Sequence, residues 1–186
     1  MPLLKNDIHF KLKNEDKVII QVAGFREQKD QVTLIKALKH LSLNIKLILV
    51  GDGTLKKSCE NLVRVLNLED RVFFLGIRSD IPQLLKSVDI IVLSTKYEGI
   101  SLSSIEGMAS GKPFVASDVP GLRNIVTNAG LLFKQGDDKA LATTISKLLN
   151  DEKLYNEISK RCQERAVHYD INNLINKHIT LYTKFK

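Results

Sequence analysis

The sequence predicts a doubly wound, mostly parallel α/β fold with about six strands, helices on both faces of the sheet and a helical C-terminal tail. Strand-sized apolar runs alternate with helical patterns along almost the whole chain. The runs are continuous rather than alternating, which is typical of strands buried on both faces. Glycine follows nearly every run, where the backbone turns tightly or approaches a ligand closely.

The elements follow from local pattern. The first apolar run, residues 18–23, is rich in β-branched residues. The segment after it, residues 30–41, has apolar residues at helical spacing, namely Leu34, Ile35, Leu38 and Leu41. The same reasoning predicts strands at residues 18–23, 45–50, 71–75, 89–93, 113–116 and 131–133. Helices are expected at residues 30–41, 55–66, 81–86, 101–110 and 137–149, followed by a polar helical region over 151–186.

Length and composition favour one globular domain. The chain has 186 residues, 44% of them hydrophobic and 26% charged, which excludes a disordered or fibrous protein. No apolar run reaches the roughly 18 residues of a membrane span, and no secretory signal is expected. The two cysteines, Cys59 and Cys162, form no CxxC motif. This pattern argues against a disulfide framework or a zinc site and favours a reducing cytoplasm.

The net charge of +7 is compatible with phosphate-bearing partners or an anionic membrane surface. Solubility alone explains it equally well. No basic motif interleaved with aromatic residues is present, so nucleic acid is not an expected partner.

Ligands of an open parallel sheet bind beyond the carboxyl ends of its strands. After the first strand, Arg26 and Lys29 precede a helix N-terminus, a combination suited to a phosphate or diphosphate. After the fourth strand, residues 98–101 lead into a second helix N-terminus. Each segment is also compatible with a plain solvated loop, with Ser101 as a helix cap in the second case.

Glu98 and Glu106 stand eight residues apart and could form a carboxylate pair, although such spacing is common by chance. The absence of GxGxxG and GxxxxGK[ST] motifs argues against a dinucleotide dehydrogenase and a P-loop NTPase. No histidine pair has metal-ligand spacing, so we assign surface or packing roles to His9, His40, His168 and His178.

Five segments together resemble one family. They are VAGFREQKDQVTLIKAL (22–38), LILVGDGT (47–54), RVFFLGIR (71–78), the stretch 89–108, and ASGKPFVASD (109–118). They resemble the C-terminal, nucleotide-sugar-binding half of retaining glycosyltransferases of family 4, which have the GT-B architecture and Rossmann-like domains. The resemblance covers residues 17–185, and its most specific part is the E-x7-E motif from Glu98 to Glu106, followed by GMASGKP.

The resemblance implies a role for each matching residue. Glu98 is the catalytic glutamate beside the transferred sugar, and Glu106 binds the nucleotide ribose. No metal is expected. The donor diphosphate is held by Arg26, Lys29, Gly99, Ile100, Ser101 and Leu102, and the nucleobase edge is lined by Gly76, Ile77 and Arg78.

Two positions depart from the family pattern. Gly24 stands where relatives commonly have arginine, and Arg26 is expected to replace it. Asn124 stands where many relatives have glutamate; neutral drift is the favoured explanation, and a difference in donor handling is the alternative.

The resemblance also implies a domain organisation. Residues 1–16 are expected to be a linker or arm, and residues 17–186 a single donor-binding domain without the N-terminal acceptor domain. The helix from Asn172 to Phe185 would cross to that domain, in cis or in trans. Without it, apolar residues should be partly exposed, namely Leu174, Ile175, Ile179, Leu181, Tyr182 and Phe185.

The function implied is transfer of a sugar, with retention, from a UDP- or GDP-linked donor to a glycan or lipid-linked acceptor. The half alone is expected to be inactive and cytoplasmic, with contact to the inner face of the membrane compatible with its charge. The alternative is a non-catalytic nucleotide-sugar-binding module that docks onto a separate acceptor-domain protein. A sugar-nucleotide epimerase half shares the architecture, but the E-x7-E motif disfavours it.

Overall fold

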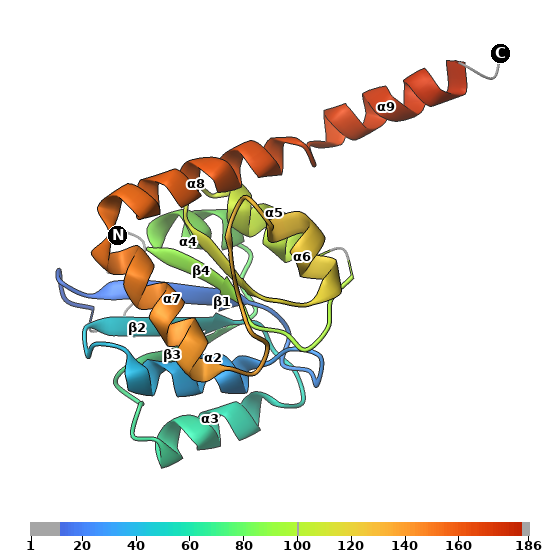
Figure 1. Ribbon diagram of the computed structural model, residues 1–186. Helices are drawn as coiled ribbons and strands as arrows, with labels where there is room; N and C mark the ends of the chain where they lie inside the picture. Colours follow the sequence, from blue (N-terminus) through green and yellow to red (C-terminus); the bar gives the residue numbers. More distant parts are fainter. Residues whose placement is uncertain (1–11, 100, 184–186) are drawn as a thin grey trace.

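The computed structural model describes residues 12–99 and 101–183, and it forms a six-stranded, entirely parallel sheet flanked by helices (Figure 1). The predicted fold class is therefore confirmed. The strands are β1 (Lys17–Val22), β2 (Ile45–Val50), β3 (Val72–Gly76), β4 (Ile90–Leu93), β5 (Phe114–Ser117) and β6 (Leu131–Phe133). The helices are α2 (Gln31–Ala37), η1 (Leu38–His40), α3 (Lys56–Val65), α4 (Ile81–Ser87), α5 (Leu102–Ala109), α6 (Pro120–Val126), α7 (Asp138–Asn150), α8 (Glu152–Val167) and α9 (Ile171–Thr183).

The strand order is β3-β2-β1-β4-β5-β6, so the chain builds outward from β1 to one edge and then from β4 to the other. The order reverses between β1 and β4. In a doubly wound sheet, a crevice opens at such a switch point, beyond the carboxyl ends of the two strands. The fold therefore directs attention to the loops that follow β1 and β4.

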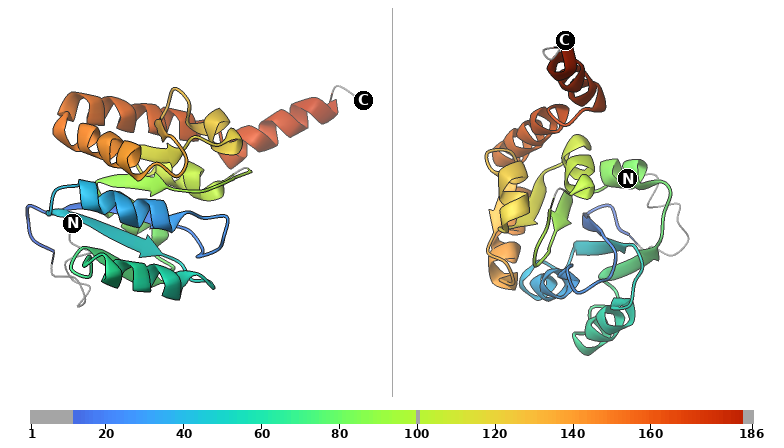
Figure 2. Two further views of the ribbon diagram at one scale, coloured as in Figure 1. Left: turned by 60° about the horizontal axis from the view of Figure 1, so that its bottom comes forward. Right: turned by 90° about the vertical axis from the view of Figure 1, so that its right-hand side faces the viewer.

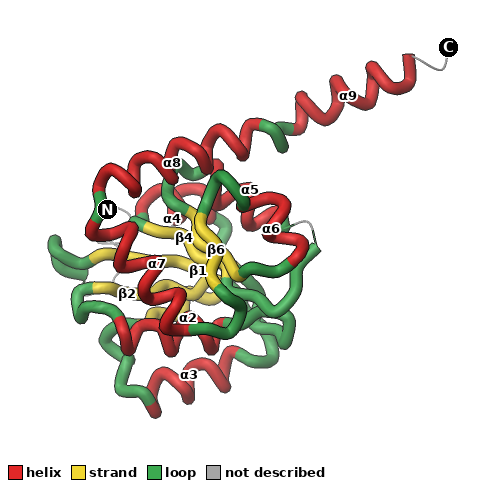
Figure 3. Tube along the Cα trace, viewed as in Figure 1, coloured by secondary structure: helices red, strands yellow, loops and turns green. Residues whose placement is uncertain are grey.

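Helices cover both faces of the sheet. Helices α2, α3 and α7 lie on one face, and α4, α5 and α8 lie on the other (Figure 2). The four central strands β1, β2, β4 and β5 are mostly buried, as the continuous apolar runs predict, whereas the edge strands β3 and β6 are mostly half-buried. Figure 3 shows the strands enclosed by helices, with the loops gathered at the two ends of the sheet.

Two expectations about the helices need correction. Helix α6 is missing from the predicted elements, because it begins with Pro120-Gly121, a typical turn signal. Proline at the first helical position is nevertheless well suited to start a helix. The helix expected over 30–41 ends as an α-helix at Ala37 and continues as the short 3₁₀ turn η1.

The C-terminal region consists of two helices with a break between them. Helix α8 packs against α5, whereas α9 extends away from the sheet (Figure 1). Four apolar side chains of α9 are exposed as expected, namely Ile175, Ile179, Leu181 and Tyr182, and Ile171 is exposed as well. The side chain of Leu174, residue Phe185 and residues 1–11 of the predicted arm lie outside the described part of the structure. Within the described part, no helix is both long and apolar enough to cross a bilayer.

Candidate functional site

The loops after β1 and β4 run side by side at the switch point. The Asp30 amide donates to the Ser94 carbonyl (3.1 Å), and the Lys96 amide donates to the Gln28 carbonyl (2.8 Å). Between these bonds, Lys29 and Thr95 form an antiparallel bridge. Two segments that are far apart in the sequence are thus locked in a fixed register.

This register brings Lys29 and Glu98 into contact. The Lys29 ammonium pairs directly with Glu98 Oε2, and the two side chains are only 15% and 10% exposed. Gln28 Nε2 donates to the Tyr97 carbonyl (3.0 Å) and lies 3.4 Å from Glu98 Oε1. Partial burial strengthens the attraction of such charges. An anion that entered here would compete with Glu98 for the lysine.

The loop after β1 is anchored by Phe25, which is completely buried. Its amide donates to the Asp52 carbonyl (3.0 Å), and its carbonyl accepts from the Leu55 amide (3.1 Å). Arg26, by contrast, is exposed, and its side chain lies beside Gly24, where an added Cβ would come 3.6 Å from the Arg26 Nε. Arg26 thus occupies space next to Gly24, the position where the resemblance leads us to expect arginine.

The loop after β4 ends at the N-terminus of α5. Ser101 caps this helix, since its Oγ accepts from the Ser104 amide (3.3 Å) and its carbonyl accepts from the Ser104 hydroxyl (2.7 Å). The expected helix cap at Ser101 is therefore confirmed, whereas the expected binding of a diphosphate by the amides of residues 99–102 stays a prediction. Gly99 and Leu102 are exposed beside it, whereas Ile100 lies outside the described residues.

Glu106 is separate from the Lys29–Glu98 pair. It is exposed on the second turn of α5 and lines a pocket of about 320 Å³ between α5 and α4. The other residues of that pocket are Ile81, Pro82, Leu85, Lys86, Ala109 and Ser110. A ligand that touched both glutamates would have to extend along the first turns of α5.

The predicted nucleobase edge lies between β3 and α4. Gly76 has a left-handed backbone with φ of 64°, and Ile77 is 82% exposed. Arg78 donates from Nε and Nη2 to the two carboxylate oxygens of Asp80, each at 2.8 Å. These hydrogen bonds lower the pKa of Asp80. Arg78 is consequently directed toward its own loop.

Sequence reasoning missed three residues that shape this site. Gln28 and Thr95 stabilise the loops, and Gly121 at the start of α6 packs against the Glu98–Gly99 backbone so closely that a Cβ would overlap the Glu98 carbonyl oxygen. In the sequence, Gln28 is simply the polar neighbour of Lys29, and Pro120-Gly121 indicates only a turn. Their importance depends on contacts between distant segments.

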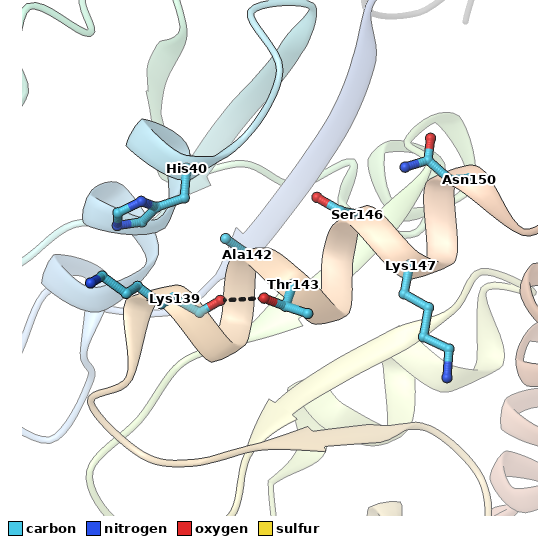
Figure 4. Close-up of a pocket in the computed structure, with 7 residues that line it drawn as sticks. All are labelled: His40, Lys139, Ala142, Thr143, Ser146, Lys147 and Asn150. Carbon is cyan, nitrogen blue, oxygen red and sulfur yellow. Dashed lines mark hydrogen bonds between the residues drawn. The ribbon is translucent and has the colours of Figure 1, made fainter.

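A second, larger hollow lies on the opposite side of the fold. It measures about 610 Å³ and is lined by α7 together with His40 (Figure 4). His40 Nε2 lies 3.0 Å from Asp138 Oδ2. The residues lining this hollow include none of the predicted site residues. Within the described ranges, no group of three or more His, Cys, Asp or Glu side chains is arranged to hold a metal ion.

Comparison with known proteins shows the family. The model of "Glycosyl transferases group 1" matches residues 5–165, which is most of the chain. The chain belongs to the group 1 glycosyl transferases. Among its relatives is the N,N'-diacetylbacillosaminyl-diphospho-undecaprenol alpha-1,3-N-acetylgalactosaminyltransferase of Campylobacter jejuni, 34% identical over 97% of this chain and 48% of that protein. The chain spans about half the length of the curated relatives it matches.

Solved structures show the same fold in this group 1 family. Anabaena HepE in complex with UDP is 28% identical, with a TM-score of 0.85 over 92% of this chain and 50% of HepE. HepE has also been solved with UDP-glucose. The C-terminal domain of a group 1 glycosyl transferase from Francisella tularensis is 24% identical, with a TM-score of 0.74 over 84% of this chain and 88% of that domain. The GT-B, Rossmann-like fold expected from the sequence is therefore confirmed.

Proposed function

We propose that this chain is the donor-binding domain of a glycosyltransferase that takes its sugar from a nucleoside diphosphate sugar. The observation that carries this proposal is the contact between Lys29 and Glu98 beside the N-terminus of α5, at the switch point of the sheet. This edge of the fold offers a cation and the positive end of a helix dipole, which suit a diphosphate. The neighbouring carboxylates suit sugar and ribose hydroxyls.

Each predicted residue has a distinct task in this proposal. Lys29, Arg26 and the amides of residues 99–102 stabilise the negative charge that develops on the departing diphosphate. Glu98 orients the sugar and does not act as a nucleophile. Glu106 accepts hydrogen bonds from the ribose, and residues 76–78 flank the base. Attack on the same face from which the diphosphate leaves accounts for retention, and this scheme requires no metal.

The donor and acceptor are proposed from the relatives. HepE binds UDP and UDP-glucose, so a UDP-linked sugar is the first donor to test, with GDP-linked sugars second. The Campylobacter relative is named for a lipid-linked diphosphate acceptor, which supports a lipid-linked or glycan acceptor here. An acceptor domain, in cis or in trans, completes the cleft, and the donor domain alone does not transfer sugar. The basic charge supports contact with an anionic membrane at the cytoplasmic face.

Ligand-dependent thermal unfolding tests the donor assignment. A panel of UDP, GDP, ADP and their sugar conjugates should contain one nucleotide that stabilises the protein. At 100 times its dissociation constant, a ligand that binds only the folded state adds about 2.7 kcal/mol, which raises the melting temperature by roughly 5–10 °C.

Calorimetry with the same nucleotide then tests the individual residues. Glu106→Ala and Lys29→Ala should each weaken binding, whereas Glu69→Ala, which removes an exposed carboxylate at the β3 side of the sheet, should not. If no nucleotide stabilises the wild-type chain, the donor-domain assignment is wrong. If Glu106→Ala binds the nucleotide normally, the ribose assignment is wrong.

A non-catalytic module that docks onto a separate acceptor-domain protein is the second candidate. The exposed apolar side chains of α9 favour it, because contiguous exposed apolar surface marks a partner site. The neighbouring coding sequence discriminates between the candidates. A separate reading frame for the other half favours the module, and an uninterrupted frame favours one two-domain enzyme.

A further inference from the structure

The border between β1 and β4 has the shortest paired register in the sheet. β1 pairs with β2 over six consecutive residues, from Lys17↔Ile45 to Val22↔Val50. With β4 it pairs only at Ile19↔Ile90 and Ile20↔Ile91. The regular ladder therefore ends well before the loops that form the candidate site.

The side chain of Gln21 bridges the two strands where the ladder stops. Gln21 is 1% exposed, although it is polar and lies on a central strand. Its Nε2 donates to the Ser94 carbonyl (3.3 Å), and its Oε1 accepts from the Ser94 amide (3.0 Å). One carboxamide thus makes the donor and acceptor contacts that a backbone pair would make. Buried polar groups satisfied in this way fix a unique arrangement.

The contacts continue from this bridge to the ion pair. The Ser94 carbonyl that accepts from Gln21 also accepts from the Asp30 amide (3.1 Å). The Lys29–Thr95 bridge and the bond from the Lys96 amide to the Gln28 carbonyl follow in order along the two loops. The series ends where Lys29 meets Glu98.

We propose that Gln21 is a positioning residue of the donor site. It holds the carboxyl ends of β1 and β4 in the register that places Lys29 beside Glu98, although it contacts neither side chain directly. This inference rests on the proposed function only for its effect on nucleotide binding. Its geometric part stands without a ligand.

Glutamine suits this position because its amide is both donor and acceptor. Leucine is of similar size and offers neither group. Ionised glutamate offers acceptors only, so it would repel the Ser94 carbonyl. Protonated glutamate again has one donor and one acceptor, and burial favours that neutral form.

Amide hydrogen exchange tests the geometric part. In Gln21→Leu, the Asp30 and Lys96 amides should lose protection by roughly tenfold or more relative to amides of the β1–β2 ladder, which report general stability. Ser94→Ala is the matched control. The buried Ser94 hydroxyl has no hydrogen-bond partner among the described residues, and both bonds to Gln21 use main-chain atoms. The inference is wrong if, in Gln21→Leu, the amides of the β1–β2 ladder lose as much protection as those of Asp30 and Lys96. It is also wrong if protection at Asp30 and Lys96 is unchanged.

Nucleotide affinity tests the functional part, with whichever nucleotide stabilises the wild-type chain. Gln21→Leu should bind roughly tenfold more weakly, and Ser94→Ala should bind normally. Gln21→Glu should bind weakly at about pH 8 and recover toward the wild-type affinity at about pH 5.5, measured against wild type at each pH. It also serves as the second variant if Gln21→Leu does not fold.

These outcomes separate the two claims. If wild type binds no nucleotide, the proposed function fails and exchange at Asp30 and Lys96 still decides the role of Gln21. If wild type and folded Gln21→Leu bind equally, Gln21 does not position the site and the proposed function stands.

Discussion

Lys29 and Glu98 form an ion pair beyond the carboxyl ends of β1 and β4. Their side chains are largely buried, so neither charge is well solvated. Under the proposed function, a diphosphate would replace Glu98 as the partner of Lys29. Gln28 is placed to keep a hydrogen bond to the Glu98 loop during this exchange, because its amide also reaches the Tyr97 carbonyl.

Removing the competing carboxylate should strengthen diphosphate binding. We expect Glu98→Gln to bind UDP, or the nucleotide identified in the panel, about fivefold more tightly, the size of a modest ion pair. The same variant should be impaired in sugar transfer when an acceptor domain is supplied. Calorimetry at two salt concentrations measures the affinity, and the isosteric change leaves the volume unaltered. Weaker binding of the nucleotide by Glu98→Gln would contradict the competition.

The two thiols should be inert at neutral pH. Burial raises the pKa of both Cys59 and Cys162 from the ordinary thiol value of 9.0 to about 11. The native protein should therefore react slowly with iodoacetamide at about pH 8, and the urea-unfolded chain should react quickly. Fast native labelling at either cysteine would show that its burial has been overestimated.

The raised pKa values of the two thiols also make the stability of the protein depend on pH. Between about pH 9 and 11, unfolded thiols ionise while native thiols keep their protons, so the free energy of unfolding should fall as pH rises through this window. Urea denaturation at several pH values measures this loss. The Cys59→Ala, Cys162→Ala double variant, compared over the same range, should show a smaller decline.

At the scale of the element, α6 supports the loop that carries Glu98. Its N-terminus packs on the backbone of Glu98 and Gly99 through Gly121, where any side chain would collide with main-chain atoms. An exposed ion pair between Arg123 and Asp118 links α6 to the end of β5. The helix thus supports the loop that carries Glu98 without contributing a predicted ligand.

Gly121→Ala should disturb the site through this contact. The added methyl group forces the Glu98 loop or α6 to move, and we expect a loss of about 1–3 kcal/mol in stability together with weaker nucleotide binding. Thermal unfolding and calorimetry measure the two effects. Asn124→Ala, at an exposed position of the same helix, is the control and should leave both unchanged. Wild-type behaviour of Gly121→Ala would mean that the loop accommodates the methyl group freely.

At the scale of the whole molecule, α9 stands apart from the body of the fold (Figures 1 and 2). Its described apolar side chains are exposed, with Tyr182 at 69% and Ile179 at 55%. The sheet and its two layers of helices form one continuous core, to which the described side chains of α9 contribute no residue.

A chain that ends at Asp170 should keep its stability. Because α9 buries little apolar surface, the melting temperature should change by less than about 2 °C, and nucleotide affinity should be unchanged. Removal of the exposed apolar side chains should also reduce self-association in sedimentation experiments. A fall of more than about 5 °C would show that α9 packs on the body in solution.

The sequence by itself determined the fold class and most of the elements. Continuous apolar runs specify buried parallel strands because successive side chains point to opposite faces of the sheet, and both faces must then be covered by other apolar residues. Glu98 and Lys29 were identified as candidates from a motif and from their place after predicted strands. Helix α6 was not recognised because the proline and glycine at its start resemble a turn.

Only the tertiary structure decided which of these segments meet. Lys29 and Glu98 are 69 positions apart, and Gln21 and Ser94 are 73 apart. Their contacts exist because β1 and β4 are neighbours in the sheet, although two other strands lie between them in the sequence. Hydrophobic periodicity is a local signal that reports burial and not strand order. The polar residues that align the two loops therefore become visible only once the strands are packed.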